Sequence, residues 1–125
     1  MTIHTVLVVD DSAGARRHLC DALAAIPWLD LRQAGDGAEA WRLLAGDRFA
    51  ILITDLDMPM IDGLKLAAMV RQGGAHRAIP IVVVTSESAA ANRGRFEALG
   101  IDAWMEKPVE PADLVEVVRS LLGIG

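Results

Sequence analysis

Apolar residues fill three short segments of the chain almost without interruption, at residues 6–9, 50–54 and 81–85. β-Branched residues are frequent in all three, and a strand has this composition when both of its faces are buried in a parallel sheet. Two further segments, residues 29–32 and 101–105, alternate apolar and polar positions. Alternation indicates a strand with one less-covered side, so we expect these two segments at the edges of the sheet.

Between these segments, apolar residues recur at the spacing of amphipathic helices. The pattern is clearest at residues 19–26 and 114–121. Weaker helical patterns cover residues 38–44, 64–71 and 88–99. The last of these includes Gly94, which costs a helix about 1 kcal/mol relative to alanine, so we expect the least stable helix there.

The strict alternation of five predicted strands with five predicted helices indicates an α/β fold. The connections should be right-handed crossovers, with helices on both faces of a parallel sheet. With the second and fifth strands at the edges, the strand order becomes 2-1-3-4-5, the doubly wound (βα)5 sandwich of flavodoxin-like proteins. Such sheets bind ligands at the carboxyl ends of the strands where the winding reverses, here between the first and third strands.

Composition narrows the class of protein. The 125 residues, of which 53% are hydrophobic, suit a single domain over residues 1–125. Seventeen acidic residues against twelve basic ones give a net charge of -5, which argues against direct binding of nucleic acid. No apolar stretch reaches the ~20 residues needed to cross a bilayer. The first apolar run ends at Asp10 and Asp11, unlike a signal peptide, so we expect a cytoplasmic protein without membrane contact.

The histidines and the single cysteine show no pattern of catalysis. His4, His18 and His76 lack the spacing of a metal site or a catalytic triad, and we expect them at the surface. Cys20 cannot form an internal disulfide or a cysteine-ligated zinc site, and a structural thiol is the favoured interpretation.

Charged and hydroxyl side chains stand at the ends of four predicted strands: Asp10 and Asp11 at the first, Asp55 at the third, Thr85 at the fourth and Lys107 at the fifth. Because neighbouring parallel strands lie ~4.8 Å apart, the three carboxylates must crowd together and repel one another. Magnesium relieves such repulsion, since it prefers carboxylate, carbonyl and water oxygens. The ammonium of Lys107 and the hydroxyl of Thr85 extend the prediction to a receptor for a phosphoryl group.

Each feature alone has a simpler interpretation. Asp10, Asp11 and Ser12 could cap the first helix, where acidic residues are favourable. Asp55 and Asp57 could belong to a solvated loop. Their meeting at one edge of the predicted sheet is what favours a binding site.

Four motifs in a fixed order resemble the receiver domains of two-component response regulators, the CheY-like family. They are VLVVDDS at residues 6–12, ILITDLDMPMIDG at 51–63, IVVVTS at 81–86 and WMEKP at 104–108. The resemblance extends over essentially the whole chain. It implies that Asp55 accepts a phosphoryl group from the phosphohistidine of a sensor histidine kinase or a phosphotransfer protein.

The resemblance also implies a metal ion. The carboxylates of Asp10, Asp11 and Asp55, with the backbone carbonyl of Asp57, would hold Mg²⁺, for which Mn²⁺ could substitute. A carboxylate is already ionised near neutral pH, so the nucleophile would need no general base.

Further roles follow from the family. Lys107 and Thr85 would stabilise the charge on the transferred group. Asp57 and Glu87 match positions that tune slow self-dephosphorylation, so the chain is expected to be a phosphoacceptor rather than a classical enzyme. Thr85 and Trp104 match the switch residues, where tryptophan departs from the more usual tyrosine or phenylalanine.

The expected output is a change in the face built from the fourth helix, the fifth strand and the fifth helix. That face would bind a downstream protein, and phosphorylation could also drive dimerisation there. A stand-alone regulator is favoured over a receiver excised from a longer protein.

Two other functions compete. A phosphorylation-independent protein-binding module would keep the receiver fold without accepting a phosphoryl group. All five active-site positions nevertheless carry the residue types expected for phosphorylation, which argues against this function. Asp55-Leu56-Asp57 also matches superficially the nucleophile pair of magnesium-dependent phosphatases of the haloacid dehalogenase type. Those enzymes carry the pair on an early strand and usually have a cap domain, for which 125 residues leave no room.

Overall fold

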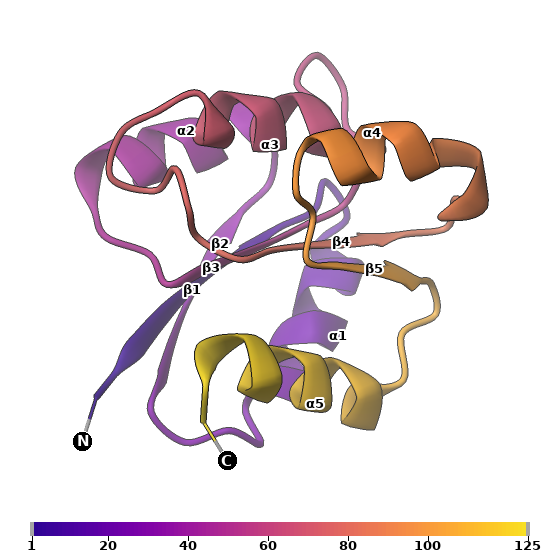
Figure 1. The fold of residues 1–125 in the computed structure, drawn as a ribbon. Helices are drawn as coiled ribbons and strands as arrows, with labels where there is room; N and C mark the ends of the chain where they lie inside the picture. The colour runs from indigo at the N-terminus through magenta and orange to yellow at the C-terminus, as the bar shows by residue number, and fades with distance from the viewer. Residues whose placement is uncertain (1, 125) are drawn as a thin grey trace.

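The computed structural model describes residues 2–124, which form one five-stranded parallel sheet in the order β2-β1-β3-β4-β5 (Figure 1). The strands are β1 (His4–Val9), β2 (Leu29–Ala34), β3 (Ile51–Thr54), β4 (Ile81–Thr85) and β5 (Ala103–Glu106). The helices are α1 (Ala13–Leu23), α2 (Gly37–Gly46), α3 (Gly63–Arg71), α4 (Arg93–Ala98) and α5 (Pro111–Leu122), with a 3₁₀ turn at Ala90–Asn92. The predicted fold class and strand order are confirmed. None of the helices in the described residues is long and apolar enough to span a membrane.

Helices cover both faces of the sheet. Figure 1 shows α1 and α5 on one face and α2, α3 and α4 on the other. Side chains of β3 alternate between the two layers: Ile51 and Ile53 pack toward α1 and α5, whereas Leu52 packs toward α2 and α3. All residues of β3 and β4 are buried, as expected for central strands, while β2 and β5 are only partly buried at the edges.

Polar side chains fix where three helices begin. Ser12 accepts a hydrogen bond from the backbone N–H of Ala15, so its predicted capping role is confirmed. Asp36 caps α2 and Asp62 caps α3 in the same way, each with an oxygen 2.7 Å from a backbone nitrogen of the first turn. These caps set the positions of the loops that follow the strands.

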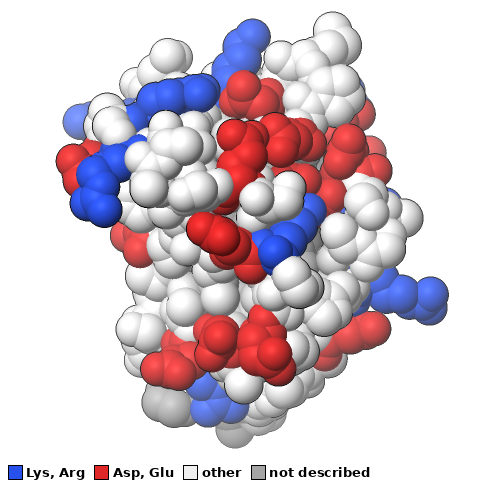
Figure 2. Space-filling view, turned by 90° about the vertical axis from the view of Figure 1, so that its right-hand side faces the viewer, with Lys and Arg blue, Asp and Glu red and all other residues white. Residues whose placement is uncertain are grey.

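The carboxyl ends of the strands lie on the right-hand side of Figure 1, and Figure 2 views the molecule from that side. Acidic side chains gather on this face, and only a few basic side chains lie among them. The negative charge of the chain is therefore prominent where a doubly wound sheet binds its ligands.

The prediction of a helix over residues 88–99 was too long. The structure forms a 3₁₀ turn at Ala90–Asn92 and a short α4 at Arg93–Ala98. No residue of α4 is buried, and the side chain of Asn92 makes no capping hydrogen bond. This segment lacks the apolar stripe that stabilises the other helices, so alanine content alone does not extend it.

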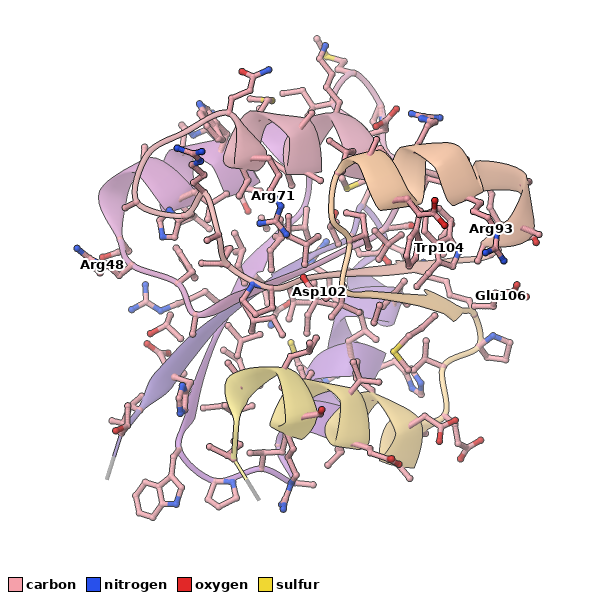
Figure 3. The ribbon with its side chains drawn as sticks, in the orientation of Figure 1. Arg48, Arg71, Arg93, Asp102, Trp104 and Glu106 are labelled. Atoms are coloured by element: carbon pink, nitrogen blue, oxygen red, sulfur yellow. The ribbon has the colours of Figure 1, made fainter. Side chains whose placement is uncertain are left out.

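The carboxyl end of α4 is held by a single arginine. Arg71, the last residue of α3, donates hydrogen bonds to the carbonyls of Ile79 at 2.6 Å, Leu99 at 3.0 Å and Gly100 at 3.1 Å. Its guanidinium also lies 3.6 Å from a carboxylate oxygen of Asp102, and Figure 3 shows both side chains between α3 and β5. The end of α4 is thus tied to the sheet.

The expectation of surface histidines is wrong for His76. The backbone N–H of Phe49 donates to Nε2 of His76 at 3.0 Å, and the two rings lie 5.9 Å apart. Burial lowers the pKa of His76, and the charge of Arg48 adds to this effect. His76 lies in the loop between α3 and β4, and a loop that folds inward leaves no periodic pattern in the sequence.

Candidate functional site

Strand register brings two aspartates side by side. Val9 of β1 pairs with Thr54 of β3, and the next residues are Asp10 and Asp55. The backbone N–H of Asp55 donates to the carbonyl of Val9 at 2.9 Å. One carboxylate oxygen from each of Asp10, Asp11 and Asp55 lies within 4.8 Å of the others. This set of hard oxygen donors fits Mg²⁺.

Backbone groups orient the two buried aspartates. Oδ1 of Asp55 accepts hydrogen bonds from the backbone N–H groups of Leu56 at 2.7 Å and Asp57 at 3.4 Å. Oδ1 of Asp10 accepts from the backbone N–H of Ser12 at 2.9 Å. In both residues, Oδ2 is left to face the centre of the site.

Lys107 fills that centre. Its Nζ donates to Oδ2 of Asp10 at 2.8 Å and to Oδ2 of Asp55 at 3.1 Å. The residue follows β5, its backbone N–H donates to the carbonyl of Thr85 at 2.8 Å, and the Lys107–Pro108 peptide bond is cis. The ammonium offsets the two buried negative charges.

The site shifts the pKa values of its own groups. Burial raises the pKa of Asp55, the hydrogen bond from Lys107 opposes this rise, and the charge of Asp10 adds to it. Burial lowers the pKa of Lys107, but hydrogen bonds to the two carboxylates outweigh burial and leave it raised. Lys107 is therefore a fixed positive charge at neutral pH.

Thr85 is the last residue of β4 and is fully buried. Its hydroxyl accepts a hydrogen bond from the backbone N–H of Glu87 at 3.2 Å. Among residues 2–124, the structure shows no hydrogen bond between this hydroxyl and Asp55. Thr85 thus stands at the same sheet edge as Asp55 and Lys107, with its hydroxyl proton free to be donated elsewhere.

Trp104 is joined to the loop that follows Thr85. The indole Nε1 donates to the carbonyl of Glu87 at 3.0 Å, and the ring lies 5.7 Å from that of Phe96 on α4. Figure 3 shows the side chain between β5 and α4. It is half-buried and packs against the apolar layer beneath α4, so an indole fits at this position.

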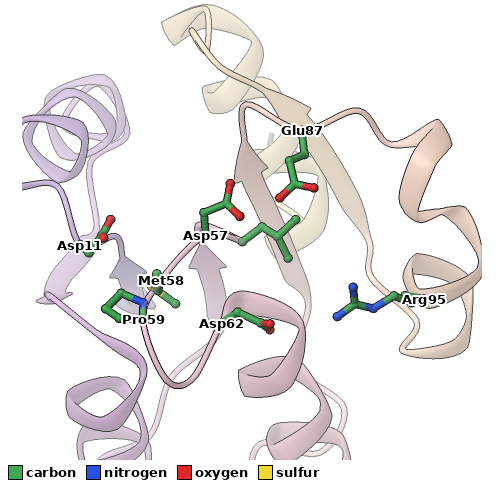
Figure 4. A pocket seen from close by; sticks show the side chains of 8 residues that line it. Asp11, Asp57, Met58, Pro59, Asp62, Glu87 and Arg95 are labelled. Atoms are coloured by element: carbon green, nitrogen blue, oxygen red, sulfur yellow. The ribbon is translucent and has the colours of Figure 1, made fainter.

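A cavity of about 540 Å³ opens at the loop that follows Asp55, where Leu56 and Asp57 line it (Figure 4). Its charged lining residues are Asp11, Asp57, Asp62, Glu87 and Arg95. Asp57 and Glu87 approach across the cavity, and a hydrogen bond between their side chains raises the pKa of Glu87. The cavity therefore lies against the residues that directly follow Asp55 in the chain.

Two residues near the site were not singled out from the sequence. Gly63 follows Asp62, and an Asp-Gly pair is typical of an ordinary turn. The structure shows that the backbone of Gly63 lies against the backbone of Asp55. Arg95 stands two positions after Arg93 in the sequence. Residues two apart on a helix point in different directions, and that spacing could have separated them.

Comparison with known proteins agrees with this geometry. The family model described as the response regulator receiver domain matches residues 6–119. The chain is 36% identical over 121 residues to a chemotaxis protein CheY homolog of Campylobacter jejuni, covering 96% of this chain and 93% of the relative. It is 35% identical to chemotaxis protein CheY1 of Helicobacter pylori, covering 94% and 96%.

Solved structures are similar over almost the full chain. A putative response regulator from Chloroflexus aurantiacus superposes with a TM-score of 0.88 at 32% identity, covering 98% of this chain and 99% of that one. The chemotaxis response regulator CheY4 of Vibrio cholerae gives a TM-score of 0.87 at 28% identity, covering 96% and 99%.

Proposed function

The chain belongs to the response regulator receiver family of phosphoacceptor signalling domains, and we propose that Asp55 is the residue that is phosphorylated. One observation carries this assignment: Oδ2 of Asp55 lies 3.1 Å from the ammonium of Lys107 and beside the carboxylates of Asp10 and Asp11. Asp10 is also buried and also faces Lys107, but Asp55 is the one that the receiver motif at residues 51–63 matches to the phosphoacceptor. The donor would be a phosphohistidine of a sensor kinase or a phosphotransfer protein.

The chemistry follows from these groups. A carboxylate oxygen of Asp55 attacks phosphorus, the bond to the donor breaks, and its electron pair leaves with the donor atom. The transferred group spreads negative charge over three oxygens, which Lys107 and the hydroxyl of Thr85 can stabilise. When Mg²⁺ or Mn²⁺ is bound by Asp10, Asp11, Asp55 and the carbonyl of Asp57, it supplies further charge neutralisation.

We propose slow self-dephosphorylation rather than turnover of a substrate. Asp57 and Glu87 line the cavity through which water reaches the acyl phosphate. Both side chains are acidic, so they place negative charge along that approach. These two residues would therefore set the lifetime of the phosphorylated state.

A chain of hydrogen bonds supports the proposed switch. The backbone N–H of Glu87 donates to the hydroxyl of Thr85, and the carbonyl of the same residue accepts from Trp104. Movement of Thr85 toward a phosphoryl group would displace Glu87 and, through it, the indole. The face of α4, β5 and α5 would then change for a downstream protein, and a dimer could form there.

Intact mass tests the phosphoacceptor assignment. The protein is incubated with phosphoramidate, with and without Mg²⁺, beside Asp55→Asn. We expect one added phosphoryl group, only with Mg²⁺ and only in the natural protein. Magnesium binding without any added mass, with a histidine kinase as well as with phosphoramidate, would instead favour the phosphorylation-independent module.

Fluorescence tests the switch. Trp28 and Trp41 are replaced by phenylalanine, so that Trp104 is the remaining fluorophore. Activation should change the emission of Trp104, because its hydrogen bond and its contact with Phe96 would both alter. An unchanged spectrum at full phosphorylation would contradict this role.

A further inference from the structure

Arg95 differs from the other charged residues around the cavity. Asp11, Asp57, Asp62 and Glu87 are acidic, whereas Arg95 is the basic residue among the charged lining groups. Figure 4 shows its side chain extending from α4 toward the cavity, opposite the loop that carries Asp57. In the part of the chain that the structure describes, its guanidinium makes no ion pair.

Arg93 provides a contrast on the same helix. Its guanidinium lies 3.9 Å from a carboxylate oxygen of Glu97, one turn along α4. It lines a separate groove, together with Phe96 and Glu97. The two arginines therefore face different surroundings, although they are only two positions apart.

The position of the cavity gives Arg95 a role in phosphoryl transfer. Attack and departure are roughly in line, so the leaving group departs on the side of phosphorus opposite Asp55. Asp55 is 6% exposed, and Leu56 and Asp57, which follow it, line the cavity. A donor that reaches Asp55 from this cavity would therefore release its leaving group past the charged lining.

Resting on the proposed function of Asp55, we propose that Arg95 is a specificity-determining residue that favours phosphodonors with an anionic leaving group. A positive charge at the exit stabilises negative charge as it develops on the departing atom. The acidic lining residues act in the opposite sense. The balance between the positive charge of Arg95 and the negative charges of the acidic lining residues sets whether donors with anionic or with neutral leaving groups react faster.

Two small phosphodonors differ in the charge of the group that leaves. With acetyl phosphate, Asp55 forms a bond to phosphorus, the P–O bond breaks, and the oxygen keeps the electron pair, so acetate leaves with a negative charge. With phosphoramidate, the P–N bond breaks from a protonated nitrogen, and neutral ammonia leaves. Both reactions give the same aspartyl phosphate, but acetate departs with a negative charge and ammonia departs without one.

The test is the ratio of phosphorylation rates with the two donors, measured by intact mass for the natural protein and for Arg95→Gln. We expect Arg95→Gln to slow the reaction with acetyl phosphate by up to about fivefold relative to phosphoramidate, the effect of one exposed charge. Arg95→Lys should restore the ratio, and Arg93→Gln should leave it unchanged.

An equal change with both donors, or an unchanged ratio in Arg95→Gln, would overturn the role of Arg95 while leaving Asp55 as the phosphoacceptor. If the natural protein reacts with neither donor nor with a histidine kinase, the proposed function itself fails. Circular dichroism checks that the variants fold, which is expected because Arg95 is exposed.

Discussion

Gly63, the first residue of α3, packs directly against the backbone carbonyl of Asp55. A side chain at this position would place its Cβ on that carbonyl oxygen, closer than real Cβ atoms come. The backbone N–H of Gly63 also donates to the carbonyl of Leu56 at 2.9 Å. The loop after β3 can fold back beneath Asp55 only because residue 63 lacks a side chain.

Gly63→Ala should therefore damage the site through the backbone. We expect a loss of about 1–3 kcal/mol in the free energy of unfolding, typical of overpacking, measured by urea denaturation. Gly46→Ala is the control, because nothing lies within 4 Å of a Cβ built there. Equal stability of the two variants would show that the contact beneath Asp55 is not restrictive.

Lys107→Met should make the protein depend on metal for stability. The variant leaves the carboxylates of Asp10 and Asp55 without their cation, and we expect a loss of about 2 kcal/mol without metal. Mg²⁺ binds only the folded site, so it should raise the melting temperature more in the variant than in the natural protein. Lys65→Met, at an exposed lysine of α3, is the control. A smaller rise in melting temperature with Mg²⁺ in Lys107→Met than in the natural protein would contradict the binding of Lys107 and Mg²⁺ to the same carboxylates.

Trp104→Phe keeps an aromatic ring beside Phe96 but removes the donor to the carbonyl of Glu87. We expect a loss of about 1 kcal/mol in the free energy of unfolding, the net value of one hydrogen bond. Trp28→Phe, at a side chain that is 51% exposed, should change stability by less than about 0.5 kcal/mol. Similar losses of unfolding free energy in both variants would argue against a stabilising hydrogen bond between Trp104 and Glu87.

His76 should make stability depend on pH. Its pKa in the folded protein lies below the ordinary value of 6.5, because burial disfavours the charged ring. The unfolded chain therefore binds the proton first as the pH falls, and the contribution of the neutral ring to stability is lost below about pH 6.5. In His76→Gln, the fall in stability between pH 7.5 and 5.5 should be smaller than in the natural protein. His4→Gln should retain the natural dependence.

Much of this architecture can be predicted from the order of residues. The central strands are predictable because both of their faces are apolar, and residues that follow such strands must meet at one edge of the sheet. Asp10 and Asp55 could thus be placed as neighbours before any coordinates. The cap at Ser12 was predictable for a similar local reason.

Other features depend on contacts that leave no local pattern. The shortening of α4 reflects the absence of a buried face rather than any single residue. The burial of His76 depends on a loop that folds over Phe49, and the link from Thr85 to Trp104 passes through backbone atoms of Glu87. Because backbone groups are nearly the same at every position, a sequence motif cannot predict a link that is made by backbone hydrogen bonds.

The most direct test of the central claim locates the phosphoryl group on the chain. The protein is treated with phosphoramidate and Mg²⁺, then with borohydride, which reduces an aspartyl phosphate to homoserine, and its peptides are analysed by mass spectrometry. We predict homoserine at position 55 alone, and none when Mg²⁺ is removed. Modification at Asp10, Asp11 or Asp57 instead of Asp55 would contradict the account.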